Sequence, residues 1–293
     1  MTALDGFLVL DKPAGITSRD AVNRVQAWLT KRTHVGHAGT LDPLATGVLV
    51  IAIGQATRLV EYVQDMPKTY VSTFLLGARS DTDDADGTIT QLKGVAPIEL
   101  SRIEAVLPQF IGEILQAPPA YSAVKIDGKR AHDLARCGEE VAPRARCVRI
   151  DSIQIVHFDW PRLTVEVHCG KGTYIRSIAR DLGQALGCGG LVETLRRTRI
   201  GQFHVEDAVT LDDQAAPKKL RPMSDAVIEL PRVDVTAAEA AQLRQGQAIA
   251  GTASGQAAVF CDGELIAIVL GDADKLRPVK VFRVFAPGAQ ATG

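Results

Sequence analysis

The chain has 293 residues, 46% of them hydrophobic and 23% charged, and a formal net charge of −1. This length exceeds one average domain, and this apolar content excludes a disordered chain. No apolar run approaches the roughly 20 residues that cross a bilayer, and the N-terminus lacks the features of a signal peptide. We expect a soluble cytoplasmic protein with no membrane partner, made of a large domain at residues 1–225 and a small one at 226–293.

The first 117 residues alternate strand patterns with helical ones. Apolar β-rich runs predict strands, and apolar residues three or four apart after a capping residue predict helices. The expected strands are Gly6–Leu10, Val48–Ile53 and Thr69–Leu76. The expected helices are one that Ser18 caps and that ends near Leu29, a short one at Ala56–Val63, and one that begins with the capping box Ser101–Glu104.

The rest of the chain continues this mixture and then becomes β-rich. The expected elements up to residue 187 are a helix at Asp127–Cys137, strands at Val148–Phe158 and Leu163–Cys169, and a helix that Thr173 caps and Gly187 ends. Beyond Arg221 they are a helix at Val235–Leu243, a hairpin turning at Asp262-Gly263 and a strand at Val279–Phe285. Strands and helices interspersed without βαβ repetition predict an α+β fold with a mixed or antiparallel sheet, followed by a small β-rich domain.

Basic residues are concentrated in the middle of the chain. Residues 118–200 carry 14 basic and 9 acidic side chains, a local charge of +5, whereas residues 1–117 and 201–293 are each at −3. These basic residues form either an ordinary solvated surface or a face that binds along the phosphates of a nucleic acid. The arginines that would form this basic face are Arg130, Arg136, Arg144, Arg146, Arg149, Arg196, Arg197 and Arg199.

The most informative motif is GHAGTLDPLATG at residues 36–47, immediately before the apolar run at 48–53. Pro43 disfavours the helical conformation at Asp42, and the three glycines permit backbone shapes that a Cβ would block. A rigid loop that presents a single carboxylate suits a nucleophile or a base. The alternative is a structural Asx-turn at the junction of a loop and a strand.

This motif closely resembles the catalytic motif of the TruB branch of pseudouridine synthases. Five further segments look like blocks of that family and occur in the family's order. They are Asp11–Pro13, Lys68–Tyr70, Asp81–Gly87, Pro118–Ala123 and Lys171–Arg176. The six blocks together span most of residues 5–200, which is a highly specific signal.

The resemblance implies the pseudouridine-synthase fold, in which a long mixed sheet carries the catalytic cleft across its middle. The C-terminal region is similar to the PUA-type domain that many TruB enzymes carry. The implied activity is the isomerisation of uridine 55 in the T-loop of tRNA, in which the C1′–N1 bond breaks and C1′ is joined to C5. This reaction gains and loses no electrons, so we expect neither a cofactor nor a metal.

Three residues of these blocks match the family's catalytic positions. Asp42 is the implied catalytic carboxylate, and its attack on C1′, its attack on the base and its removal of a ribose proton all remain open. Arg176 is implied to pair with it, since a guanidinium favours the charged form of a carboxylate and fixes its orientation. Tyr70 is implied to pack on the target base, where a stacked ring contributes about 1–3 kcal/mol.

Five more residues match positions around the substrate. His37 resembles the family histidine that fills the space left when the target base is flipped out of the RNA. Tyr174 and Leu195 match positions that line the pocket, and Lys12 and Pro13 match a loop that supports the site. Without this resemblance, each of these residues would be interpreted as an ordinary core, turn or surface residue.

No pattern in the sequence supports a metal site. His34 and His37 lack a third ligand and the H-E-x-x-H context, and the acidic loop at Asp81–Gly87 has Leu92 where a calcium loop has its glutamate. The five cysteines are scattered and include no C-x-x-C pair, which predicts free thiols. The chain departs from the family pattern at Ala38, where a threonine is common, and at His132, where an aromatic residue is usual.

We therefore predict a monomeric tRNA pseudouridine synthase that acts without a guide. One alternative is a guide-RNA-dependent relative, although the chain lacks the lysine-rich tails common in such proteins. A second is a noncatalytic protein that binds or folds tRNA, which would be expected to have lost Asp42. A third is a glycoside hydrolase, which would need a second acid that nothing near Asp42 in sequence supplies.

Overall fold

The computed structural model describes residues 4–30, 32–121, 125–126, 129–130, 144–213 and 219–283, with only the backbone at 125–126 and 129–130. Within these ranges the predicted helix at Asp127–Cys137 is represented only by Lys129–Arg130, which form a short strand, β9, paired with β8 (Lys125–Ile126). The rest of that helix, with Arg136 and His132, lies outside the described residues, as do Ser122 and Ala123. None of the described helices is both long and apolar enough to cross a membrane.

One large sheet organises the first 204 residues. Its strands follow the order β1-β3-β12-β4-β11-β10-β7, with β2 paired to β3 and β13 to β12. Every pairing within this sheet is antiparallel except that between β3 and β12. The strands are β1 (Gly6–Lys12), β2 (Val35–His37), β3 (Thr46–Ile53), β4 (Lys68–Leu76), β7 (Gly112–Gln116), β10 (Arg146–Asp159), β11 (Arg162–Cys169), β12 (Gly190–Ile200) and β13 (Phe203–His204).

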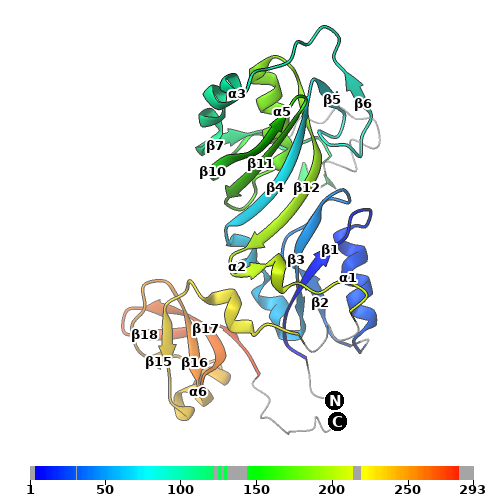
Figure 1. Ribbon diagram of the computed structural model, residues 1–293. Helices are drawn as coiled ribbons and strands as arrows, with labels where there is room; N and C mark the ends of the chain where they lie inside the picture. The colour runs from blue at the N-terminus through cyan, green and yellow to red at the C-terminus, as the bar shows by residue number, and fades with distance from the viewer. Residues whose placement is uncertain are drawn as a thin grey trace.

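The large sheet has two halves, which β4 and β12 join (Figure 1). One half holds β7, β10 and β11 with the helices α3 (Leu100–Val106) and α5 (Ile175–Leu186), and the hairpin of β5 (Ala78–Ser80) and β6 (Ile89–Gln91). The other half holds β1, β2 and β3 with α1 (Ser18–Ala27) and α2 (Val60–Asp65), which follows the 3-10 helix η1 (Gly54–Leu59). The described part of the chain therefore supports the predicted α+β class with a mixed sheet.

Strand β3 is buried on both of its faces. Leu49 and Ile51 pack in one apolar core with α1 and α5, whereas Val48 and Val50 pack in a second core with η1 and α2. A strand covered on both faces carries a continuous apolar run instead of an alternating one. The run that follows the GHAGTLDPLATG motif therefore anchors the motif in the centre of the protein.

The two halves of the sheet meet at a very short parallel pairing. Only Thr46 and Gly47 of β3 pair with Arg196 and Arg197 of β12. Gly47 has a φ of +96°, and a Cβ built on it would lie 2.1 Å from the carbonyl oxygen of Arg197. Only glycine permits β3 to approach β12 this closely.

The C-terminal residues form a second, five-stranded sheet of order β14-β16-β17-β18-β15 with one helix. The turn between β16 and β17 has positive φ at both Asp262 and Gly263, as expected for the predicted hairpin. These elements are β14 (Arg232–Asp234), α6 (Ala237–Arg244), β15 (Ile249–Ala250), β16 (Gln256–Cys261), β17 (Glu264–Asp272) and β18 (Lys275–Val281).

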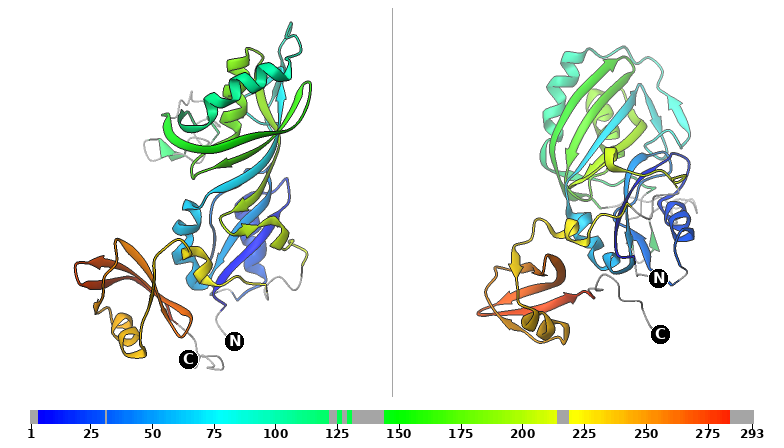
Figure 2. Two further views of the ribbon diagram at one scale, coloured as in Figure 1. Left: turned by 60° about the vertical axis from the view of Figure 1, so that its left-hand side comes forward. Right: turned by 60° about the horizontal axis from the view of Figure 1, so that its bottom comes forward.

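This C-terminal unit packs beside η1 and α2 (Figure 2). Phe260 and Phe282 belong to the same apolar core as Leu59 and Val63. Polar contacts surround this shared core, among them the ion pair of Lys280 with Glu61 at 2.9 Å and the hydrogen bond from Tyr62 to Gln256 at 2.8 Å. The 3-10 helix η5 (Met223–Val227) contributes Ala226 and Val227 to the same core.

Three predicted helix starts are wrong. Thr17, not Ser18, caps α1, through a capping box with Asp20. Glu99 precedes α3 without a side-chain cap, so Ser101 lies inside that helix. Tyr174 precedes α5, also without a side-chain cap, and Thr173 instead donates to the carbonyl of Gly170 at 3.2 Å. The end of α5 is as predicted, since Gly187 adopts the left-handed conformation with a φ of +73°.

Candidate active site

Asp42 lies on the loop between β2 and β3, and its side chain is 34% exposed. The buried hydroxyl of Ser18 holds this loop, since it accepts from the Leu41 amide at 2.8 Å and donates to the Leu41 carbonyl at 3.0 Å. Ala45 donates its amide to the Asp42 carbonyl at 3.1 Å. The loop therefore presents the carboxylate on a backbone that is fixed on both sides.

Lys12 ties a second loop to the Asp42 loop. Its side chain is fully buried, and Nζ donates to the carbonyls of Pro13 at 2.8 Å, Ile16 at 2.9 Å and Pro43 at 3.3 Å. Burial lowers the pKa of Lys12 to about 8, against a smaller opposing effect of Asp42. Pro13 itself is exposed. Lys12 supports the loop that carries Asp42 and is too buried to bind a substrate directly.

Arg176, in the first turn of α5, faces Asp42. The guanidinium is 5% exposed, and Nε lies 3.0 Å from Oδ2 of Asp42. This Nε has no aligned hydrogen-bond acceptor among the described residues, so the contact is an ion pair without a hydrogen bond. The other nitrogens donate to the carbonyls of Thr82 at 2.9 Å and Tyr121 at 3.0 Å. A fixed guanidinium thus lies against a partly exposed carboxylate.

A second carboxylate, Asp84, pairs with the same guanidinium. Its Oδ2 lies 3.1 Å from Nη1 of Arg176, and the residue is 3% exposed. Its Oδ1 accepts from the Thr82 hydroxyl at 2.5 Å and from the Asp86 amide at 3.1 Å. Burial raises the pKa of Asp84, whereas the Thr82 hydrogen bond and Arg176 act in the opposite direction. Arg176 is therefore held between one accessible and one buried acid.

Tyr70, on β4, lies in the apolar core beside the Asp42 loop and is 7% exposed. Burial raises the pKa of its phenol, with a smaller opposing effect of Arg197. The guanidinium carbon of Arg197 lies 6.0 Å from the centre of the ring. Leu195, also 7% exposed, lies on the neighbouring strand β12 and belongs to the same core.

His37 ends β2, where it pairs with Ile51 of β3. Its Nδ1 is buried and has no hydrogen-bond partner among the described residues. Burial is the main cause that lowers the pKa of His37, and nearby Arg19 and Arg197 lower it further. Ala38, at the position where the family commonly has threonine, is fully buried, so a hydroxyl there would need a partner inside the core.

Tyr174 lies immediately before α5. Its backbone is bound in both directions by the buried side chain of Gln116, which accepts from the Tyr174 amide at 2.8 Å and donates to its carbonyl at 3.1 Å. The guanidinium of Arg146 packs over the Tyr174 ring at 5.0 Å and donates to the Gly172 carbonyl at 2.9 Å. The ring is half-buried and carries a cation on one face.

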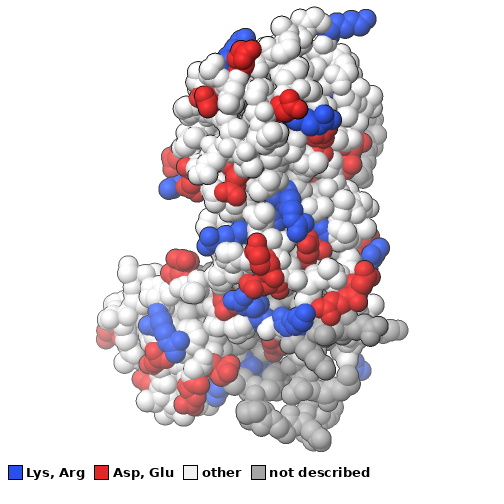
Figure 3. Space-filling view, in the orientation of Figure 1, with Lys and Arg blue, Asp and Glu red and all other residues white. Residues whose placement is uncertain are grey.

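The predicted basic face is only partly present among the described residues. Lys and Arg side chains gather across the middle of the face shown in Figure 3, with Asp and Glu beside them. Arg149 is exposed and pairs with Asp151 at 2.6 Å, and Arg196 pairs with Asp11 at 2.7 Å. Arg197 is 1% exposed, so its assignment to a phosphate-binding face was wrong: its side chain points into the core.

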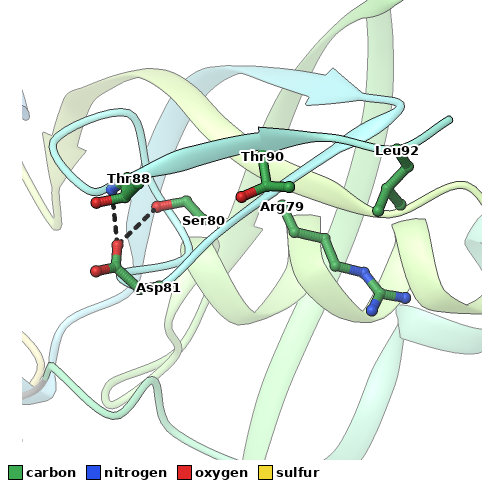
Figure 4. Close-up of a pocket in the computed structure, with 6 residues that line it drawn as sticks. All are labelled: Arg79, Ser80, Asp81, Thr88, Thr90 and Leu92. Carbon is green, nitrogen blue, oxygen red and sulfur yellow. Dashed lines mark hydrogen bonds between the residues drawn. The ribbon is translucent and has the colours of Figure 1, made fainter.

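A pocket of about 500 Å³ lies against the hairpin of β5 and β6 (Figure 4). Its lining residues are Arg79, Ser80, Asp81, Thr88, Thr90 and Leu92. Asp81 accepts from the Thr88 amide at 2.8 Å and from the Ser80 hydroxyl at 3.5 Å, which closes the acidic loop that also carries Asp84. None of the predicted catalytic residues lines this pocket.

Three families match consecutive parts of the chain. Residues 27–175 match "TruB family pseudouridylate synthase (N terminal domain)", residues 176–223 match "tRNA pseudouridylate synthase B C-terminal domain", and residues 230–283 match "tRNA Pseudouridine synthase II, C terminal". The chain is 43% identical to the tRNA pseudouridine synthase B of Dinoroseobacter shibae over 96% of each chain. It is 41% identical to the Mycobacterium bovis protein of the same name, over 95% of this chain and 96% of that protein.

The chain belongs to the TruB family of pseudouridylate synthases.

Solved structures support the same fold. The TruB-family chain superposes on a chain of a Cbf5-Nop10-Gar1 complex with a TM-score of 0.73 and 29% identity, over 96% of this chain and 85% of that one. A chain from an H/ACA RNP bound to a substrate RNA containing 2′-deoxyuridine gives a TM-score of 0.71 and 26% identity, over 96% and 85%. Family membership and this likeness establish the pseudouridine-synthase fold that the motifs implied.

In this TruB-family structure Asp42 and Arg176 contact each other, and Lys12 is hydrogen-bonded to the Asp42 loop. Tyr70 and Leu195 belong to the apolar core that also includes Leu41 of this loop. Sequence reasoning missed Asp84 and the buried position of Arg197. Asp84 is one of four aspartates within six residues, and no local pattern distinguishes it from the other three. Asp83 pairs with Arg180 at 2.9 Å, which leaves Asp84 to Arg176.

Proposed function

We propose that this protein isomerises uridine 55 in the T-loop of tRNA to pseudouridine. The observation that carries the proposal is the pairing of the half-exposed Asp42 with the buried Arg176, within a TruB-family fold. The relatives at 41–43% identity are named for tRNA. Identity to the chain of the H/ACA RNP, at 26%, is much lower, so a guide-dependent role is less favoured.

The proposed chemistry uses one carboxylate. Asp42 attacks the ribose or the base, or removes a ribose proton, so that the C1′–N1 bond breaks. The freed uracil turns and C1′ is joined to C5, which then loses its proton to water while N1 takes one up, and Asp42 is released as the free carboxylate. Arg176 pairs with the carboxylate and fixes its orientation in each of these three routes. Because Asp84 also pairs with Arg176, the guanidinium keeps one carboxylate partner when Asp42 loses its charge. The reaction is redox-neutral and requires no cofactor or metal.

The other predicted residues receive roles that fit their positions. Tyr70 and Leu195 would pack on the flipped uracil, and the phenol oxygen of Tyr70 would accept the C5 proton while its own proton passes on to water. Burial raises the pKa of this phenol. His37 would take the space that the base vacates in the RNA, with its free Nδ1 as a hydrogen-bonding atom. Tyr174 would form the wall of the pocket next to Arg146.

We further propose that the protein acts as a cytoplasmic monomer, with a PUA-like C-terminal domain from residue 226 that contacts the acceptor end of tRNA. Lys12 and Pro13 would support the catalytic loop and take no part in the reaction. The three hydrogen bonds from Lys12 to backbone carbonyls support this role.

Release of tritium from tRNA labelled at uracil C5 tests the proposed activity. One transcript has the intact T-loop, and a second carries cytidine at position 55. We expect tritium release from the intact transcript and only background release from the transcript with cytidine at position 55. Equal release from both would place the reaction at another uridine, and no release from either despite tight binding would indicate a guide-dependent or noncatalytic protein.

The exposed members of the basic face should contribute to tRNA affinity through phosphates. We expect the affinity to fall with salt, and Arg149→Met and Arg199→Met each to reduce the slope of log K against log salt concentration by about one. The isomerisation rate at saturating tRNA should stay unchanged, because neither residue contacts Asp42. Filter binding across a salt series measures the slopes; an affinity that hardly depends on salt would contradict the phosphate contacts.

A further inference from the structure

Arg197 is among the largest side chains of the structure that are completely enclosed. It is 1% exposed, and no carboxylate of the described residues forms an ion pair with it. Burying a cation without an anion is costly, and proteins accept such a group only where dedicated hydrogen bonds hold it. The contacts of this guanidinium therefore require an explanation.

Its three hydrogen bonds to backbone carbonyls go to the loop that carries Asp42 and to β3, the strand that follows this loop. Nη2 donates to the carbonyl of Gly39 at 3.1 Å, Nη1 to that of Thr40 at 3.3 Å, and Nε to that of Val48 at 2.8 Å. The first two carbonyls precede Asp42 and the third follows it. One rigid guanidinium thus binds both the loop before Asp42 and the strand after it, which a lysine ammonium could not do with the same geometry.

Arg197 lies on β12, one of the two strands that join the halves of the sheet. Its backbone pairs with Tyr70 of β4 on one side and with Gly47 of β3 on the other. Its guanidinium carbon lies 6.0 Å from the centre of the Tyr70 ring. This residue is therefore placed where the strand carrying Tyr70 and the loop carrying Asp42 approach each other.

We propose that Arg197 is a positioning residue for the isomerisation, which fixes the Asp42 loop relative to Tyr70 across the joint between β3 and β12. This inference rests on the proposed function. The complete burial of Arg197 excludes contact with RNA phosphate in this conformation, and its carbonyl ligands distinguish it from Arg176, which contacts Asp42 itself.

The inference is tested with Arg197→Lys, which retains the charge, and Arg197→Gln, which removes it and leaves two amide donors. Arg162→Met is the control. Arg162 lies on β11 in an exposed ion pair with Glu193, and none of its side-chain contacts with the described residues involves the Asp42 loop. Single-turnover rates of tritium release at saturating tRNA and the Kd for tRNA are measured separately. Circular dichroism verifies that each variant is folded.

We expect each Arg197 variant to lower the single-turnover rate by about 100-fold, the effect typical of a displacement near 1 Å in a reacting group. The Kd for tRNA should stay within about twofold of the parent value, since a buried side chain makes no RNA contact, and Arg162→Met should retain the parent rate. A folded Arg197→Gln or Arg197→Lys protein with the parent rate would overturn the inference. So would a loss confined to tRNA affinity, or a failure of both variants to fold. An inactive parent protein would instead refute the proposed function.

Discussion

Replacing Asp42 by asparagine is expected to abolish pseudouridine formation, with a loss of about 10⁴-fold or more in the single-turnover rate. The amide is nearly isosteric with the carboxylate but carries neither the negative charge nor the basicity that nucleophilic attack or proton removal requires. Arg176 would then lie against a neutral amide, while Asp84 would still neutralise it. The fold and the tRNA affinity should therefore be retained, as tritium release and filter binding would establish.

Asp272→Asn is the matched control for this experiment. Asp272 forms an exposed ion pair with Arg277 at 2.9 Å in the C-terminal sheet, and such surface pairs contribute little to stability. The control should keep the parent rate. Residual activity of Asp42→Asn within tenfold of the parent protein would show that another group performs the chemistry, even if the variant binds tRNA normally.

Replacing Arg176 by lysine is expected to lower the rate of isomerisation by roughly 10²–10³-fold, because a preorganised cationic group next to the reacting atoms is lost. Lysine keeps the charge, but its single ammonium cannot reach Asp42, Asp84 and two backbone carbonyls together. The carbonyls of Thr82 and Tyr121 would lose their donors, and the Asp42 carboxylate would no longer be oriented. Single-turnover rates with saturating tRNA measure the loss.

The same helix contains a second arginine, which serves as a control for the arginine-to-lysine change. Arg180, four residues further along α5, pairs with Asp83 and Asp181 and donates to the Ala117 carbonyl at 2.9 Å. It is partly buried but makes no contact with Asp42. Arg180→Lys should therefore cost stability without a comparable loss of rate. If Arg180→Lys and Arg176→Lys reduce the rate equally, the effect belongs to the packing of α5 and not to the Asp42–Arg176 pair.

The order of elements could largely be predicted from the sequence, whereas strand β12, which lies between β3 and β4 in the large sheet, could not. The predictions for β1, β3, β4, β10 and β11 rest on runs of apolar residues. Strand β12 was not predicted. Its segment GLVETLRRTRI contains three arginines within four residues, a pattern typical of an exposed segment. The structure buries only one of those three side chains, and that burial depends on carbonyls supplied from residues 39–48.

The site could be predicted residue by residue only through the resemblance to TruB enzymes. Asp42 and Arg176 are 134 positions apart, and no local pattern indicates that they form an ion pair. Prediction from residue type was also wrong where a side chain is hydrogen-bonded to a residue distant in the sequence. Ser18 has the residue type of a helix cap, yet its hydroxyl is bonded to Leu41 of the catalytic loop, and Thr17 takes the cap.

The apolar core shared by the two units makes the C-terminal sheet part of the scaffold that supports catalysis. Phe260 and Phe282 share that core with Val63 of α2 and with Met66, which precedes β4, the strand of Tyr70. A change at either phenylalanine is therefore expected to loosen the packing of Met66, which lies four residues before Tyr70. Residues more than 190 positions beyond Met66 thus complete the core on which the segment entering β4 packs.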